Sequence, residues 1–218
     1  MGIKEKAISE TERFVKERLV GAEGGHDWWH IQRVWTLAKR IASEEHADLF
    51  VVELAALLHD ISDSKFNGGD DNAGAQIAGE FLQSLKLGQD IINHVKQIIT
   101  NVSFKGGEGQ RSFNSPELDV VQDADRIDAL GAIGIARAFN YGGFKNREIY
   151  NPGVPPVMNM CTEEYRNNKG HTINHFYEKL LLLKDRMNTE SGREIADERH
   201  RFLVVFLNRF KSEWDGNS

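Results

Sequence analysis

The sequence predicts an all-α protein. Apolar residues recur at spacings of three and four through most of the 218 residues, which is the period of amphipathic helices. No run of any length shows the strict apolar–polar alternation of a half-buried strand. Glycine, proline and short polar clusters separate the periodic segments, as turns between helices would.

Three helices are expected in the first part of the chain. An amphipathic segment covers about residues 3–15 and stops near the glycines of 21–25. The second helix begins near Asp27 and carries a broad apolar face. The third, over 50–58, is apolar nearly all round and should therefore be central, with Asp48 placed to cap its first turn.

Helices and loops alternate in the middle of the chain. Residues 66–71 should form a loop, followed by a helix that ends near Leu85 and another over about 90–100. The stretch 103–114 is rich in glycine and charge and has no apolar period, so we expect a second loop. Ser115-Pro116 then has the residue order of a helix start, with serine as the cap and proline at the first helical position.

The C-terminal part differs in composition. After Gly131 the chain stays small and apolar to Ala138, and the segment 141–170, which holds three of the four prolines, should be irregular. Two closing helices are expected, over about 171–187 and 190–211. Because the helices on either side of 141–170 are too few for separate domains, we interpret residues 1–218 as one domain.

Composition and charge argue against several classes of protein. The net charge is −6 and lysine and arginine form no dense cluster, which disfavours nucleic-acid binding. A single cysteine, Cys161, cannot form an intramolecular disulfide and suits a reducing compartment. The N-terminus lacks the apolar core of a signal peptide, and no apolar run approaches the ~20 residues of a membrane span. These features predict a cytoplasmic protein without membrane association.

A functional site is indicated at His59-Asp60, where the most apolar of the predicted helices ends. An unpaired buried carboxylate is costly, so its charge needs a basic side chain, a hydrogen-bond network or a metal ion nearby. A second pair, His26-Asp27, follows two glycines at a helix start, where Asp27 is better explained as a cap.

Further metal ligands are available on other predicted helices. His30 shares a helix side with Val34, so it should point to the core. Three aspartates interrupt another apolar surface, and helical spacing places Asp125 and Asp128 on one face, with Asp123 pointing away. Each residue alone is better explained by a core hydrogen bond or an ion pair than by a metal. Spacing by itself leaves a metal site and a structural network as alternatives.

The order His30, His59-Asp60, Asp125 resembles the H…HD…D signature of the HD-domain metal-dependent phosphohydrolases. The flanking residues agree best with the single-domain bacterial branch that includes nucleoside triphosphate pyrophosphohydrolases. The resemblance covers about residues 20–140 and a motif near the C-terminus. The matching segments are His26-Asp-Trp-Trp-His-Ile-Gln-Arg-Val34, Ala55-Ala-Leu-Leu-His-Asp60, Asp123-Ala-Asp-Arg-Ile-Asp-Ala-Leu-Gly131 and Asn174-His-Phe-Tyr-Glu-Lys-Leu180.

The resemblance implies an HD-domain helical bundle, with a C-terminal helical extension over about 171–212. It also implies one divalent metal ion, Mn²⁺ or Mg²⁺ first, with Fe²⁺, Ni²⁺ or Co²⁺ as alternatives, since a mixed imidazole and carboxylate set suits all of them. The implied ligands are His30, His59, Asp60 and Asp125, and Asp123 remains an alternative to Asp125.

The resemblance and the sequence also suggest groups for catalysis and substrate binding. Asp63 aligns with a general acid/base of related enzymes, although it could be a turn residue, and His94 is a second catalytic candidate or a core histidine. The candidate substrate contacts are Lys65, Arg126, Tyr150, His171, His175 and Lys179. For Lys65 and Arg126, surface ion pairs are an equal alternative.

The function that these features favour is metal-dependent hydrolysis of a nucleotide, with cleavage of (deoxy)nucleoside triphosphates to monophosphate and pyrophosphate as first choice. A nucleoside monophosphate phosphatase is second. A cyclic dinucleotide phosphodiesterase is third, because no Gly-Tyr-Pro element occurs. A di-iron oxygenase would need additional histidine ligands, for which His94 is the obvious candidate. A ligand-sensing module with a degenerate site is disfavoured, because all four ligands are present. The oligomeric state stays open, a homodimer being one option.

Overall fold

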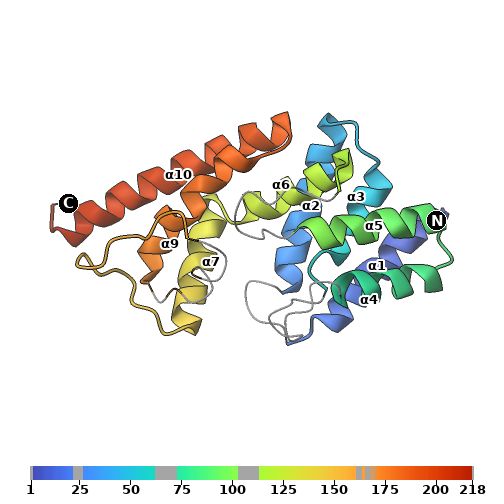
Figure 1. Cartoon of the computed structure of the whole chain (residues 1–218), viewed down its shortest axis with the longest axis horizontal. Helices are drawn as coiled ribbons and strands as arrows, with labels where there is room; N and C mark the ends of the chain where they lie inside the picture. The colour runs from blue at the N-terminus through green and yellow to red at the C-terminus, as the bar shows by residue number, and fades with distance from the viewer. Residues whose placement is uncertain are drawn as a thin grey trace. The chain divides into compact units, whose positions relative to one another are not determined.

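The computed structural model describes residues 2–21, 27–61, 73–102, 113–160, 164, 168 and 170–217. Throughout these ranges all regular structure is helical, which confirms the predicted all-α class (Figure 1). No helix in these ranges is long and apolar enough to cross a membrane. The chain divides into two compact units, Met1–Asp125 and Arg126–Ser218. That the two together form one domain stays a prediction.

The N-terminal unit is organised around α3 (Leu49–Leu58), against which α1, α2 and α5 pack. Eight of the ten residues of α3 are buried, so this helix is central, as its uniformly apolar sequence predicts. Each leucine that α3 removes from water stabilises the fold by roughly 1.5–3 kcal/mol. The other helices of this unit are α1 (Ile3–Arg18), α2 (Trp28–Glu44), α4 (Ala73–Ser84), α5 (Gln89–Val102) and the first ten residues of α6 (Pro116–Asp128).

Three predicted caps are present and fix where helices begin. The Asp48 carboxylate accepts hydrogen bonds from the backbone N–H groups of Phe50 and Val51 at 2.9 and 3.4 Å. The Ser115 hydroxyl oxygen accepts from the N–H of Leu118 at 3.1 Å, directly before Pro116. Asp27 caps α2 in the same way. Each cap satisfies N–H groups that have no partner within the helix, typically worth about 1 kcal/mol.

The C-terminal unit contains α7 (Gly131–Phe144), α9 (Thr172–Glu178), the 3₁₀ helix η1 (Leu180–Arg186) and the long α10 (Glu190–Trp214). The prediction of one helix over 171–187 is wrong, because the α-helix ends at Glu178 and the 3₁₀ helix η1 follows from Leu180. In a 3₁₀ helix residues three apart lie above one another, so Leu180 and Leu183 can both be buried on one side. The predicted irregular segment is also shorter, since α7 extends to Phe144.

Aromatic rings hold the C-terminal unit together. Phe206 of α10 lies 6.0 Å from Phe139 of α7 and 5.7 Å from Phe176 of α9, measured between ring centroids. Tyr150 packs edge-on against Trp214 at 4.9 Å, which ties the segment after α7 to the end of α10. These contacts explain why α9 is stable although it is only seven residues long. A helix this short is not stable by itself, and burial of its side chains supplies the missing free energy.

Candidate metal centre

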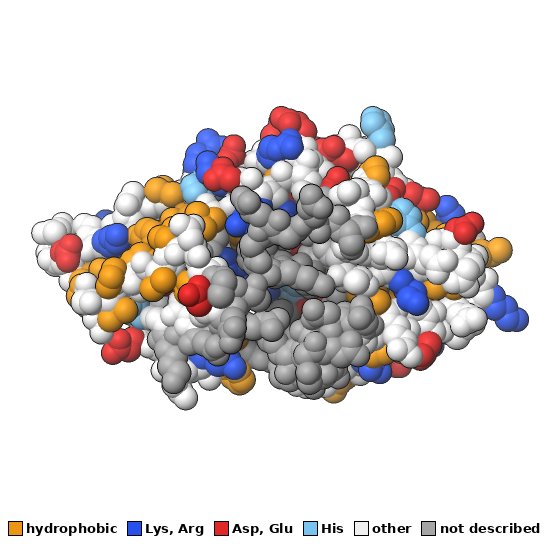
Figure 2. Space-filling view, in the orientation of Figure 1, with side chains coloured by type: hydrophobic (Ala, Val, Ile, Leu, Met, Phe, Trp, Pro, Cys, Tyr) orange, Lys and Arg blue, Asp and Glu red, His pale blue; other side chains and the backbone are white. Residues whose placement is uncertain are grey.

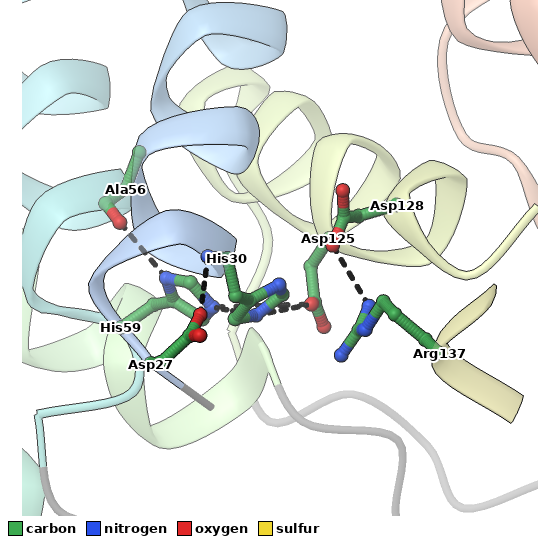
Figure 3. Close-up of polar contacts among 7 residues, drawn as sticks. All are labelled: Asp27, His30, Ala56, His59, Asp125, Asp128 and Arg137. Carbon is green, nitrogen blue, oxygen red and sulfur yellow. Dashed lines mark hydrogen bonds and ion pairs between the residues drawn. The ribbon is translucent and has the colours of Figure 1, made fainter. Parts of the chain in front are cut away.

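His30 lies in the first turn of α2 and is positioned by the cap of that helix. The Asp27 carboxylate accepts a hydrogen bond from the backbone N–H of His30 at 3.0 Å, which fixes the turn (Figure 3). The residue is 1% exposed, and Val34 on the same side of the helix is fully buried. Its imidazole therefore points into the N-terminal unit, as the spacing predicts.

His59 is the residue that ends α3, and its ring is oriented by the same helix. Its Nδ1 lies 2.8 Å from the carbonyl oxygen of Ala56. Because a carbonyl can only accept, Nδ1 carries the proton and donates it, and the lone pair of a neutral ring is left on Nε2. That Nε2 lies 3.3 Å from Nε2 of His30, with the two rings inclined at 69° (Figure 3).

Two carboxylates complete a cluster of donor atoms. One ligand atom each from His30, His59 and Asp60 lies within 4.8 Å of the others. Oδ1 of Asp125, on α6, lies 3.4 Å from Nε2 of His30 and 3.8 Å from Nε2 of His59 (Figure 3). The structure thus brings together the four residues that the family resemblance implies as metal ligands.

The geometry of the cluster fits a metal ion. Ligand atoms at about 2.1 Å from one ion, at angles between octahedral and tetrahedral values, are separated by about 3.0 to 3.4 Å. The separations of 3.3, 3.4 and 3.8 Å among the two imidazoles and Asp125 are close to that range. Metal-bound histidines usually donate their other ring N–H to a carbonyl or carboxylate, as His59 does to Ala56.

The other two aspartates of α6 differ from Asp125 in exposure and partners. Asp123 is completely buried, whereas the side chain of Asp125 is 32% exposed. Asp128, which helical spacing places on the face of Asp125, is 2% exposed and accepts a hydrogen bond from Nη1 of Arg137 at 2.8 Å (Figure 3). Asp125 lies within ion-pair distance of both His30 and His59.

His94, a residue of α5, contacts residues at the beginning of α6. Its Nε2 is 3.0 Å from the hydroxyl of Ser115 and 3.3 Å from the carboxylate of Glu117. Glu117 in turn accepts from the backbone N–H of Asp48 at 2.9 Å. Glu117 precedes Asp125 by eight residues, or about 12 Å along the helix. These contacts are those of a residue that ties α5 to α6, the structural alternative to a catalytic role.

Two of the residues proposed to contact the substrate, Arg126 and His171, form hydrogen bonds with backbone groups of the C-terminal unit. Arg126 donates from Nη1 to the carbonyl of Arg186. His171 caps α9: its Nδ1 accepts from the N–H of Asn174 at 3.2 Å, and its Nε2 donates to the carbonyl of Val154 at 3.1 Å. Both ring nitrogens of His171 are therefore engaged, which also fixes its neutral tautomer.

The remaining candidates of this unit lie around α9. Tyr150 packs edge-on against the ring of His171 at 5.2 Å, within the aromatic contacts described above. Burial, together with the charges of Lys179 and Arg147, lowers the pKa of His175 to about 3. His175 is therefore neutral at neutral pH and could offer a phosphate a hydrogen bond but no positive charge.

Asp63 and Lys65 lie outside the described residues, so their roles stay predictions. One functional contact was not anticipated, the hydrogen bond from His59 to the carbonyl of Ala56. Its signal is the three-residue spacing between Ala56 and His59 at a helix end, where the last four carbonyls lack partners within the helix.

Comparison with known proteins agrees with this arrangement. The HD domain family matches residues 28–130, the part of the chain that contains all four clustered residues. A protein of known structure from Lactobacillus plantarum is 36% identical, with 97% of this chain and 98% of that chain covered and a TM-score of 0.84. An HD-superfamily hydrolase from Bacillus thuringiensis is 40% identical over 97% and 98% of the two chains, with a TM-score of 0.77.

YpgQ of Bacillus subtilis, whose crystal structure contains ADP, is 35% identical over 97% of each chain, with a TM-score of 0.78. The similarity to these proteins extends over nearly the full length of both partners, well beyond the motif region. The chain belongs to the HD superfamily of hydrolases.

Proposed function

We propose that this chain is a metal-dependent phosphohydrolase that acts on nucleotides and cleaves (deoxy)nucleoside triphosphates to monophosphate and pyrophosphate. The observation that carries the proposal is the cluster of His30, His59, Asp60 and Asp125, in which two buried imidazoles face each other with a carboxylate beside them. Two buried imidazoles with carboxylates in such proximity are stabilised by a shared cation.

The four residues would hold one divalent ion, with Mn²⁺ or Mg²⁺ as first choice. Four protein ligands leave two positions of a six-coordinate ion for water and a phosphate oxygen. A bound ion supplies an acidified water and polarises the phosphorus that the water attacks. The protein's part is to fix the ligand positions, through the Asp27 cap of α2 and the His59–Ala56 hydrogen bond.

Support for a nucleotide substrate comes from YpgQ, which binds ADP in its crystal and is similar to this chain over 97% of its length. ADP has the base, the sugar and two of the three phosphates of a nucleoside triphosphate. A triphosphate also offers the better leaving group. Pyrophosphate leaves as a stabilised anion, whereas a monophosphate releases an alkoxide that needs a proton from an acid such as Asp63.

The proposal is tested by product analysis. Purified protein is incubated with Mn²⁺ and each deoxynucleoside triphosphate, and the products are separated by ion exchange. We expect equal amounts of monophosphate and pyrophosphate, and no product from a His59→Ala variant prepared in parallel. Stepwise release of orthophosphate, or hydrolysis of monophosphates alone, would contradict the proposal and assign the chain as a phosphatase.

A further inference from the structure

The long helix α10 exposes apolar side chains on a face that its own unit does not cover. Phe202 is 51% and Val205 is 63% exposed. Figure 2 shows hydrophobic side chains gathered on the C-terminal unit, where α10 lies in Figure 1. The opposite face of α10 carries Ala196, Leu203 and Leu207, which are buried. The helix is thus anchored by one face while a second apolar face remains in contact with water.

This second face has the spacing of a coiled-coil seam. Glu198, Phe202, Val205 and Arg209 follow one another at intervals of four, three and four residues. At 100° per residue they lie within about 60° of one another on the helix, so they form one narrow strip. We call these four residues the α10 seam. It has two apolar residues in the middle, an acid at one end and a base at the other.

Such a strip is complementary to itself only when the two helices run in opposite directions. A twofold axis passing between residues 203 and 204 places Phe202 opposite Val205 of a second copy. The same axis places Glu198 opposite Arg209, and it does so twice, once on each side. A parallel pairing would instead bring like charges together at both ends, which is unfavourable.

We propose that the α10 seam is the contact surface for a second copy of this chain, paired antiparallel, with Glu198 of each copy against Arg209 of the other. Arg209 forms an ion pair with Glu213 of its own helix, and its planar guanidinium has further N–H groups for a second carboxylate. This proposal does not depend on the activity proposed above.

The size of the seam sets the expected strength of the contact. It spans eleven steps along the helix, or about 17 Å. A strip of that length supplies only part of the roughly 800 Å² per partner that a standard interface buries. We therefore expect a reversible dimer, with a dissociation constant on the order of micromolar, that depends strongly on its few apolar and charged contacts.

Charge reversal tests the pairing, with the dissociation constant measured by sedimentation velocity from about one to several hundred micromolar protein. Glu198→Arg and Arg209→Glu should each weaken the dimer at least about 10-fold, because each puts two like-charged pairs into the contact. The combined variant E198R/R209E should recover to within about 3-fold of the original, since reversing both ends restores opposite charges. Circular dichroism should show an unchanged helix content, because both positions are exposed.

Arg193→Glu is the matched control. Arg193 is an exposed arginine of the same helix, paired with Glu190 as Arg209 is with Glu213, but it lies about 150° around the helix from the seam. The Arg193→Glu variant should lose the local ion pair with Glu190 and have the same dimer dissociation constant as the original protein. The proposal is overturned if the protein is a monomer at the highest concentration, if the single reversals do not weaken the dimer, or if the combined variant does not recover.

Discussion

The Nε2 atoms of His30 and His59 lie 3.3 Å apart, although His30 lies in the first turn of α2 and His59 directly follows the end of α3. Two imidazole nitrogens at that distance either share a proton or share a cation. The proton on Nδ1 of His59, held by Ala56, leaves Nε2 as an acceptor in the neutral ring. The adjacent Oδ1 of Asp125 adds negative charge at the same point, which favours a cation there.

The first prediction concerns that cation. His59→Ala or Asp60→Ala should remove most bound metal and all hydrolysis, and leave the helix content unchanged. The thermal midpoint of the original protein should rise with added Mn²⁺ and that of the variants should not, because a ligand that binds only the native state stabilises it. Elemental analysis after dialysis measures occupancy. Full activity with no bound metal would refute the assignment.

A second prediction distinguishes the two aspartates of α6. Asp125→Asn should weaken metal binding by 10-fold or more, because the amide lacks the charge that faces both imidazoles. Asp123→Asn alters a fully buried carboxylate, so we expect a loss of about 1–3 kcal/mol in unfolding free energy with metal affinity retained. Isothermal titration with Mn²⁺ and urea unfolding measure the two quantities. The reverse pattern would make Asp123 the ligand.

The proposed acid/base can be separated from the ligands. Asp63→Asn should keep the metal and lower turnover by about 10²-fold or more, the usual range for loss of general acid–base catalysis. Turnover is followed by pyrophosphate release, with metal content measured on the same sample. Loss of metal would place Asp63 among the ligands, and unchanged turnover would make it a turn residue.

A substitution of His94 distinguishes a structural role of this residue from a catalytic one. His94→Ala should lower the unfolding free energy by about 1 kcal/mol, because it removes the link from α5 to Ser115 and Glu117. Turnover measured well below the thermal midpoint should change less than about 3-fold. A fall of 10²-fold or more with unchanged stability would instead show the catalytic role that the sequence allowed.

Acid sensitivity should be traceable to His175. Its pKa is about 3 in the folded protein against 6.5 for an ordinary histidine, so the unfolded chain takes up this proton first as the pH falls. The stability due to the neutral ring is complete above pH 6.5 and decreases as the pH falls toward 3. At pH 5 the loss is on the order of 2 kcal/mol.

His175→Gln should therefore reduce the difference in urea midpoint between pH 7 and pH 5. The matched control is His46→Gln, which changes a histidine on the surface. The control should keep the full pH difference of the original protein. Equal pH differences in all three proteins would mean that other groups cause the acid sensitivity.

Much of the N-terminal unit could be predicted from the sequence, because its signals are local. Helical period, the Asp48 cap and the Ser115-Pro116 start each act within a few residues, and all three are present in the structure. The cluster of candidate ligands could be predicted because His30, His59 and Asp125 each interrupt an apolar surface. Polar residues in such positions need a partner, and the family signature indicated that they share one.

The features that could not be predicted from the sequence depend on contacts between distant segments of the chain. The end of α9 at Glu178 follows from the burial of Leu180 and Leu183 in the 3₁₀ helix, which no local rule reveals. The partners of Arg126 and His171, the carbonyls of Arg186 and Val154, are 60 and 17 residues away in the chain. Long-range hydrogen bonds to backbone carbonyls carry no residue signature, since every residue has a carbonyl.

The hydrogen bond between His59 and Ala56 has a consequence for how the ion arrives. The carbonyl of Ala56 is among the last four of α3, so the same bond that orients the ring also satisfies the end of the helix. The ligand is thus held in place without any ion, as is His30 by the Asp27 cap. Metal uptake should then be limited by water exchange on the ion, and stripping with a chelator should be reversible without refolding.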